Sequence, residues 1–312
     1  MNYKYKAAIL ICTYNPKWEE LKKTVESSLE QRQDGFLLQI VVADDGSKED
    51  HFDKLREYFA QVGFEDYCLA KLPENQGTVC NLKNGCNYVD AEYIKDISPG
   101  DYFSRPQFLS EWIDALEKSG KVWSFTDAYY YHMDGENRVI TNEYAHPQAV
   151  KPYLNKNDAL CRWNYVVYSD VILGATLLAK AGYYKEYIDR ICGKVKYAED
   201  HMLILMSFDG LVGFYYEKPS IYYEYGVGIS SNGSDKWTKL LAKDYGELEK
   251  IMFADVEKLD SFQKLIYKAY QLKGAGNKLI KLIKAPHRLW LLQYNISKDY
   301  FTRKTPNENS TH

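Results

Sequence analysis

The chain has 312 residues, of which 46% are hydrophobic and 27% are charged, a composition typical of globular proteins and unlike that of disordered chains. The net charge of −3 argues against general nucleic-acid binding, and no apolar run approaches the roughly 18 residues of a membrane-spanning helix. The six cysteines are scattered and form no C-x-x-C pair, so the sequence favours a reduced, cytoplasmic protein over a zinc or disulfide framework.

The first predicted elements are a buried strand, a helix and a second buried strand. Residues 7–12 form an apolar run that ends at a Thr-Tyr-Asn-Pro turn, and residues 40–43 form another that ends at two aspartates. Between them, residues 18–31 carry apolar side chains at helical spacing. Short apolar runs bounded by turn residues are typical of parallel strands that are covered on both faces.

The same alternation continues through the first 131 residues. Helices are expected over residues 50–62, 78–89 and 105–119, and strands over 68–72, 93–97 and 122–131. The pattern is looser between about 135 and 230, apart from a helix over 199–208, and becomes mostly helical from 235 onward. Alternating strands and helices predict a largely parallel sheet with right-handed crossovers.

Polar residues follow the predicted strands at their carboxyl ends. These groups are Thr13-Tyr14-Asn15, Asp44-Asp45, Asn75 with Gly77, and Asp101, and a further pair, Glu199-Asp200, opens a later helix. Open α/β sheets bind ligands at this edge. The sequence therefore predicts a single crevice with carboxylates on several sides, suited to a nucleotide.

Five segments in register resemble family 2 glycosyltransferases of the GT-A fold. They read ILICTYNP, VVADDGS, ENQGTVCNLKNG, ISPGDYF and YAEDHMLI, and the resemblance covers about residues 5–230. It implies an α/β nucleotide-diphospho-sugar transferase fold, in which helices flank a mainly parallel central sheet and a helical appendage follows. It also implies an inverting transfer of a sugar from a nucleotide diphosphate, usually UDP, to an acceptor hydroxyl.

The resemblance also implies a domain organisation. A catalytic domain is expected over residues 1–232, with a nucleotide-binding half at 1–101 and an acceptor half at 102–232. Residues 233–312 are expected to form a helical C-terminal region with a basic amphipathic tail.

Family members place the nucleotide at the first strand ends. By resemblance, the nucleotide-binding residues are Thr13, Tyr14, Asn15, Asp44, Asp45, Asn75, Gly77 and Lys83. A strand-end carboxylate can accept a hydrogen bond from the uracil N–H or from a ribose hydroxyl. Two plainer interpretations stay open, because Asp44-Asp45-Gly46-Ser47 also suits a turn with a helix cap and Lys83 also suits a solvated helix face.

A divalent cation is expected beside the diphosphate, because it would neutralise the charge that grows on the leaving group. Family members usually carry D-x-D after the fourth strand, whereas this chain reads Ser98-Pro99-Gly100-Asp101 and keeps one carboxylate. Asp101 is therefore the predicted metal ligand. Mg²⁺ and Mn²⁺ suit such hard oxygen donors.

Inverting transfer needs a base that takes the proton of the acceptor hydroxyl. By resemblance this base is Asp200, which the helix dipole would keep ionised, although Glu199 and Asp200 also suit simple helix capping. The sugar and acceptor side is expected to include Gly174, Ala175, Glu199, His201 and Trp163, the last of which stacks on a sugar ring or belongs to the core.

Residues 277–312 contain seven Lys or Arg and two acidic residues. Lys278, Lys281, Lys284 and Arg288 are spaced along one helical face, and Trp and Leu follow, a pattern typical of helices at anionic lipid surfaces. Contact of residues 277–292 with the inner face of the cell membrane is one interpretation. A solvated appendage and a homo-oligomer interface are the others.

The sequence thus predicts an inverting, non-processive transferase in surface or capsular polysaccharide assembly, with a UDP-sugar donor and a glycan or lipid-linked glycan acceptor. The absence of Q-x-x-R-W after Asp200 disfavours a processive synthase. The alternative is a catalytically silent sugar-nucleotide-binding protein of the same fold. A dinucleotide dehydrogenase is disfavoured because G-x-G-x-x-G is absent after the first strand.

Overall fold

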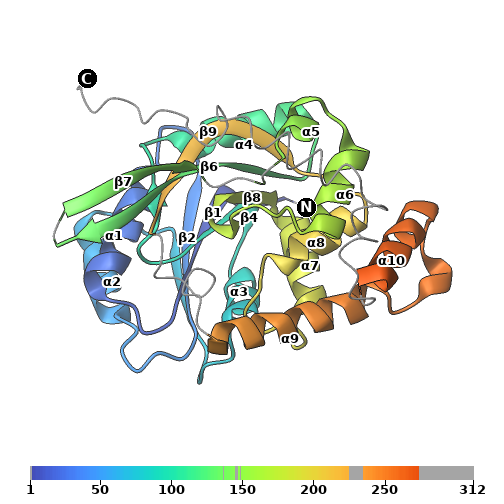
Figure 1. The fold of residues 1–312 in the computed structure, drawn as a ribbon. Coiled ribbons are helices and arrows are strands. Elements are labelled where there is room, and N and C mark those ends of the chain that lie inside the picture. Colours follow the sequence, from blue (N-terminus) through green and yellow to red (C-terminus); the bar gives the residue numbers. More distant parts are fainter. Residues whose placement is uncertain (1, 136, 145–146, 148, 225–234, 274–312) are drawn as a thin grey trace.

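The computed structural model describes residues 2–135, 137–144, 147, 149–224 and 235–273 (Figure 1). The basic segment 277–292 lies outside these residues. No helix in the described part of the chain is long and apolar enough to cross a membrane.

The strands are β1 (Tyr5–Thr13), β2 (Leu38–Asp44), β3 (Tyr67–Lys71), β4 (Ala91–Ile97), β5 (Tyr102–Phe103), β6 (Trp123–Asp134), β7 (Asn137–Tyr144), β8 (Leu177–Lys180) and β9 (Phe214–Glu224). The helices are α1 (Trp18–Leu29), α2 (Phe52–Gln61), α3 (Thr78–Cys86), α4 (Phe108–Ser119), α5 (Lys151–Leu154), α6 (Asp158–Tyr168), α7 (Ala181–Ile191), α8 (His201–Phe208), α9 (Asp235–Met252) and α10 (Ser261–Lys273), with short 3-10 turns at Gly174–Thr176 and Val256–Lys258. The elements predicted for the first 131 residues are all confirmed, as is the helix at 199–208.

The strands form one sheet in the order β3-β2-β1-β4-β8-β6-β9-β5, with β7 paired to β6. The part from β3 to β4 is parallel, as the sequence predicts. Beyond β4 the sheet is mixed, because β8 runs antiparallel to both β4 and β6, while β6 and β9 are parallel. The predicted parallel pairing thus holds for β3 to β4 and for the β6–β9 pair, and the antiparallel pairs of β5, β7 and β8 make the sheet as a whole mixed.

The mixed part of the sheet explains the looser sequence pattern after residue 130. The distal part of β6 is exposed and pairs with β7 in a hairpin, so it carries polar and aromatic residues rather than a continuous apolar run. The sequence analysis did not identify α6, α7 or β9, although α7 carries buried residues at helical spacing, among them Tyr184, Ile188 and Ile191.

Both faces of the parallel part are covered, as its apolar strands require. Ala8 and Leu10 of β1 lie in a core with side chains of α3, α7 and α8, whereas Ile9 and Ile11 lie in a second core with side chains of α1, α2 and α4. This division follows from the alternation of side chains along a strand. The two cores fix β1, β2 and β4 so that their carboxyl ends form one edge of the sheet (Figure 1).

Candidate active site

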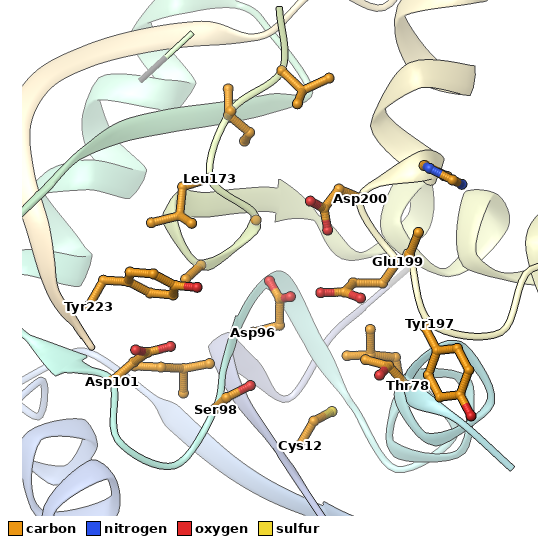
Figure 2. Close-up of a pocket in the computed structure, with 18 of the residues that line it drawn as sticks. Cys12, Thr78, Asp96, Ser98, Asp101, Leu173, Tyr197, Glu199, Asp200 and Tyr223 are labelled. Atoms are coloured by element: carbon orange, nitrogen blue, oxygen red, sulfur yellow. The ribbon is translucent and has the colours of Figure 1, made fainter. Parts of the chain in front are cut away.

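A pocket of about 570 Å³ opens at this edge of the sheet (Figure 2). Its lining comes from the ends of β1, β4 and β9, from α1, α3 and α9, from the loop after β4, from the 3-10 turn before β8 and from the start of α8. The lining includes six carboxylates and no lysine or arginine; these acidic residues are Glu20, Asp96, Asp101, Glu199, Asp200 and Glu224. The described part of the pocket is therefore strongly acidic.

Asp200 begins α8 but does not cap it. Its side chain makes no capping hydrogen bond, although the residue occupies the N-cap position. Figure 2 shows the carboxylate pointing into the pocket, near those of Asp96 and Glu199. The capping interpretation of Asp200 is therefore not what the structure shows, and the carboxylate faces the space where a ligand would bind.

The electrostatic surroundings differ from the sequence expectation for Asp200. Burial raises the pKa of its carboxyl above the ordinary value, and the charge of Asp96 raises it further. Burial likewise raises the pKa of Glu199, to which Asp200 adds. The prediction that the helix dipole keeps Asp200 readily ionised is thus opposed by burial among like charges.

His201 and Gly174 complete this side of the pocket. Burial lowers the pKa of His201 to about 4, so the ring is neutral near pH 7, and its centre lies 4.3 Å from that of Tyr245. Gly174 leaves room for Asp200, since a Cβ atom there would lie 2.9 Å from Oδ1 of the aspartate. The predicted residues Gly174, Ala175, Glu199 and His201 all line the pocket.

Asp101 lies on the opposite side, in the loop after β4. It is 7% exposed, and its Oδ1 accepts a 3.4 Å hydrogen bond from the backbone N–H of Glu224. Its own backbone carbonyl accepts a hydrogen bond from Thr24. Burial raises the pKa of Asp101 to about 7.

Asp96 is a pocket residue that the sequence analysis missed. It is 9% exposed, and its Oδ1 has no hydrogen-bond partner among the described residues. Burial raises the pKa of its carboxyl, against the opposing effect of Lys95. The available signal was the pair of adjacent charges, Lys95 and Asp96, near the end of a predicted buried strand.

Lys95 is fully buried behind the pocket. Its ammonium donates hydrogen bonds to the backbone carbonyls of Asp96 and Ala175, the latter at 2.8 Å. It therefore joins the end of β4 to the turn that carries Gly174.

The first pair of aspartates has two different roles. Asp44 is fully buried and accepts hydrogen bonds from the hydroxyl of Thr13 at 2.9 Å and from the backbone N–H and hydroxyl of Ser47. The turn interpretation therefore describes Asp44. Ser47 also accepts a hydrogen bond from the backbone N–H of Asn15, which fixes the turn after β1, while Tyr14 is 55% exposed.

Asp45 joins the next loop to this edge. Its carboxylate accepts hydrogen bonds from the Asn75 side chain at 2.9 Å and from the backbone N–H groups of Gln76 at 2.7 Å and Gly77 at 2.9 Å. Gly77 is followed by Thr78, which lines the pocket. The structure thus brings Asp45, Asn75 and Gly77 together beside the pocket, although none of the three lines it.

Two predicted site residues lie elsewhere. Lys83 forms a 2.7 Å ion pair with Asp189 of α7, so its ammonium is engaged on the outer surface of the fold. Trp163 stacks edge-on against Tyr168 and Phe262 and is absent from the pocket lining. The core interpretation of Trp163 is therefore the one that the structure supports.

The carboxylates of the pocket are potential ligands of a metal ion. Within the described residues, no group of three or more His, Cys, Asp or Glu side chains is arranged to hold one. Asp101 offers one hard oxygen donor, which matches the habit of Mg²⁺ of using one or two carboxylates together with substrate phosphates. The described residues alone therefore form no metal cage at this pocket.

Comparison with known protein families identifies the family of this chain. The model of the family described as glycosyl transferase family 2 matches residues 8–171. The chain belongs to glycosyl transferase family 2.

One curated protein is similar to part of this family 2 chain. Polypeptide N-acetylgalactosaminyltransferase 5 of Caenorhabditis elegans is 39% identical over 112 residues, which are 36% of this chain and 17% of that protein. The chain thus spans about a sixth of the length of that curated relative.

Solved structures share the fold. The structure of S. aureus TarS 1-349 in complex with UDP has a TM-score of 0.53 at 14% identity, covering 85% of this chain and 69% of that one. The complex of TarS with UDP-GlcNAc has a TM-score of 0.51 at 13% identity, covering 85% and 70%. This family 2 chain therefore has a GT-A-like fold with a mixed sheet flanked by helices.

Proposed function

We propose that this chain is an inverting, non-processive glycosyltransferase that moves a sugar from a nucleotide diphosphate, in particular UDP, to an acceptor hydroxyl. The observation that carries the proposal is that the Asp200 carboxylate makes no capping hydrogen bond to α8 and lines the same pocket as Asp101. Membership of glycosyl transferase family 2 supports the class of reaction.

The proposed reaction is a single displacement. The acceptor oxygen forms a bond to the anomeric carbon while the bond from that carbon to the phosphate oxygen breaks. Asp200 accepts the hydroxyl proton, and the nucleoside diphosphate leaves with the electron pair of the broken bond. Glu199 and His201 flank Asp200 and would contact the sugar or the acceptor.

The donor is proposed to lie between Asp200 and the ends of β1 and β2. UDP and UDP-GlcNAc are named as ligands of S. aureus TarS, which supports a uridine diphosphate donor. Thr13, Asp44 and Asp45 hold the loops at this edge, and Tyr14 and Asn15 border it. Their proposed contribution to nucleotide binding is mainly through the shape of these loops, because the carboxylates are already engaged by protein donors.

A divalent cation would supply the charge that this pocket lacks. Six carboxylates line the described part and no lysine or arginine does, so the described side chains offer a diphosphate no positive charge. Mn²⁺ or Mg²⁺, held by Asp101 and phosphate oxygens, would neutralise the leaving group.

The acceptor is proposed to be a growing surface or capsular polysaccharide, free or lipid-linked. The basic residues of segment 277–292 would then hold the protein at the inner face of the cell membrane. Sedimentation with anionic and with neutral lipid vesicles tests this proposed membrane binding. Anionic-specific binding that is lost when Lys278, Lys281, Lys284 and Arg288 become Gln supports it, and no binding to either refutes it.

A second candidate is a catalytically silent protein that binds sugar nucleotides. It is favoured by Pro99, which stands where a D-x-D pattern ending at Asp101 would carry its other carboxylate. The two functions differ in turnover rather than in binding.

The deciding experiment measures UDP release and sugar transfer from a panel of UDP-sugars with Mn²⁺, together with UDP affinity by calorimetry. Asp200→Asn is expected to lose turnover and to keep UDP binding. Asp53→Asn, an exposed carboxylate of α2, is the matched control and is expected to keep both. Wild-type protein that binds UDP without turning over any sugar donor would support the silent candidate, and failure to bind UDP would refute both.

A further inference from the structure

Helix α9 forms one wall of the pocket, although it lies beyond the residues matched by the family model. Leu241 and Tyr245, one turn apart, both line the pocket. Asp244 lies three residues after Leu241, a spacing that places both residues on the same face of the helix. Further along this face, Leu248 is buried in the core that includes side chains of α8.

Asp244 holds the chain segment that leads into Asp200. Its carboxylate accepts hydrogen bonds from three consecutive backbone N–H groups, those of Lys196 at 3.0 Å, Tyr197 at 2.7 Å and Ala198 at 3.1 Å. The residue is 3% exposed. Hydrogen bonds to an ionised acceptor are stronger than those between neutral groups, and losing the acceptor would leave three backbone donors unsatisfied.

The segment held by Asp244 is also tied on its other side. The carbonyl of Lys196 accepts a 3.2 Å hydrogen bond from the backbone N–H of Val79 in α3. Glu199 and Asp200 follow immediately, and Gly174 leaves only enough room for the carboxylate of Asp200 in its present place. A small displacement of residues 196–198 would therefore move Asp200.

We propose that Asp244 is a positioning residue for the transfer reaction, and that α9 thereby couples the C-terminal region to the catalytic carboxylate. This inference rests on the proposed function of Asp200 as the base. Asp244 does not line the pocket, so it acts through the three amides and not by contact with a substrate. Helix α9 is then part of the active site rather than an appendage.

The simpler alternative is that Asp244 only attaches α9 to the catalytic domain. That role predicts lower stability and equal losses of binding and turnover. The positioning role predicts a selective loss of kcat, because a misplaced base affects the chemical step and leaves the nucleotide edge intact.

The test compares Asp244→Asn with Glu249→Gln, which removes an exposed carboxylate from the same helix. Asp244→Asn keeps the side-chain shape but replaces one acceptor oxygen with a donor. Its kcat is expected to fall roughly 10- to 100-fold, with KM for the UDP-sugar and the affinity for UDP within about twofold of wild type. Glu249→Gln is expected to match the wild type in every measurement.

Amide hydrogen exchange over residues 193–202 gives a readout that does not depend on activity. Asp244→Asn is expected to accelerate exchange in this segment, while exchange in α2 and β1 stays unchanged. Unchanged exchange at 196–198, an unchanged kcat, or a kcat loss matched by equal loss of UDP affinity and a global rise in exchange would overturn the inference. A wild-type protein that transfers no sugar would instead overturn the proposed function, and the exchange result would still decide whether Asp244 holds the segment.

Discussion

A Cβ atom on Gly174 would lie 3.2 Å from Cγ of Asp200 and 2.9 Å from its Oδ1, and the second distance is shorter than Cβ atoms essentially ever show in folded proteins. Gly174 is needed here for space and not for backbone freedom, since it is not among the residues with positive φ. The lack of a side chain at Gly174 therefore leaves the space that the carboxylate of Asp200, the proposed base, occupies.

Gly174→Ala is expected to displace the Asp200 carboxylate without unfolding the protein. A misplacement of about 1 Å can cost roughly 100-fold in rate, so we expect kcat to fall about 10- to 100-fold while UDP affinity is retained. Steady-state kinetics with calorimetry checks this. Gly182→Ala is the control, because its added Cβ would meet only the Tyr3 hydroxyl, at 4.0 Å. An active Gly174→Ala enzyme would show that this contact is unimportant.

The rate is expected to rise with pH through the pKa of Asp200. The carboxyl must lose its proton to act as a base, and burial and Asp96 raise its pKa, so the inactive protonated form persists to higher pH than for an exposed aspartate. Asp96→Asn removes a neighbouring charge, which lowers the pKa of Asp200 and moves the acidic limb of the kcat profile to lower pH. A limb that stays in place, or moves to higher pH, would contradict this arrangement. Asp114→Asn, on the exposed face of α4, is the control.

The sequence was most informative where function depends on strand order. Apolar runs located β1 and β2, the alternation of strands and helices located β4, and parallel strands present their carboxyl ends at one edge. Strand order placed Asp101 in the crevice and the resemblance to family 2 glycosyltransferases placed Asp200 there; the two residues are 99 positions apart in the chain and line the same pocket.

Side-chain partners could not be predicted in the same way. Asp44 and Asp45 are adjacent in the sequence, yet Asp44 closes its own turn and Asp45 holds the loop around Asn75. Lys83 forms an ion pair with Asp189 of α7, a helix that the sequence analysis did not predict. These outcomes depend on contacts between distant segments, which local spacing does not encode.

The Asp44 network is expected to contribute measurably to stability. Asp44→Ala would leave the Thr13 hydroxyl and the Ser47 amide without their buried acceptor, at a cost of about 1–3 kcal/mol in the free energy of unfolding. Urea denaturation measures this directly. The matched change Asp53→Ala breaks an exposed ion pair with Arg56 and is expected to cost less than about 1 kcal/mol. Equal effects of the two substitutions would show that the buried network adds nothing.

Turnover is expected to depend on a divalent cation even though the chain keeps a single carboxylate of the D-x-D pattern. The described lining of the pocket offers a diphosphate no lysine or arginine, so chelation with EDTA should abolish transfer and Mn²⁺ or Mg²⁺ should restore it. Asp101→Asn should raise the concentration of Mn²⁺ needed for half-maximal rate, because it removes a charged oxygen ligand. Glu111→Gln, in the exposed cluster with Arg105 and Lys218, should leave that concentration unchanged. Full activity in EDTA would mean that the leaving group is neutralised by the protein itself, and the metal assignment of Asp101 would then be wrong.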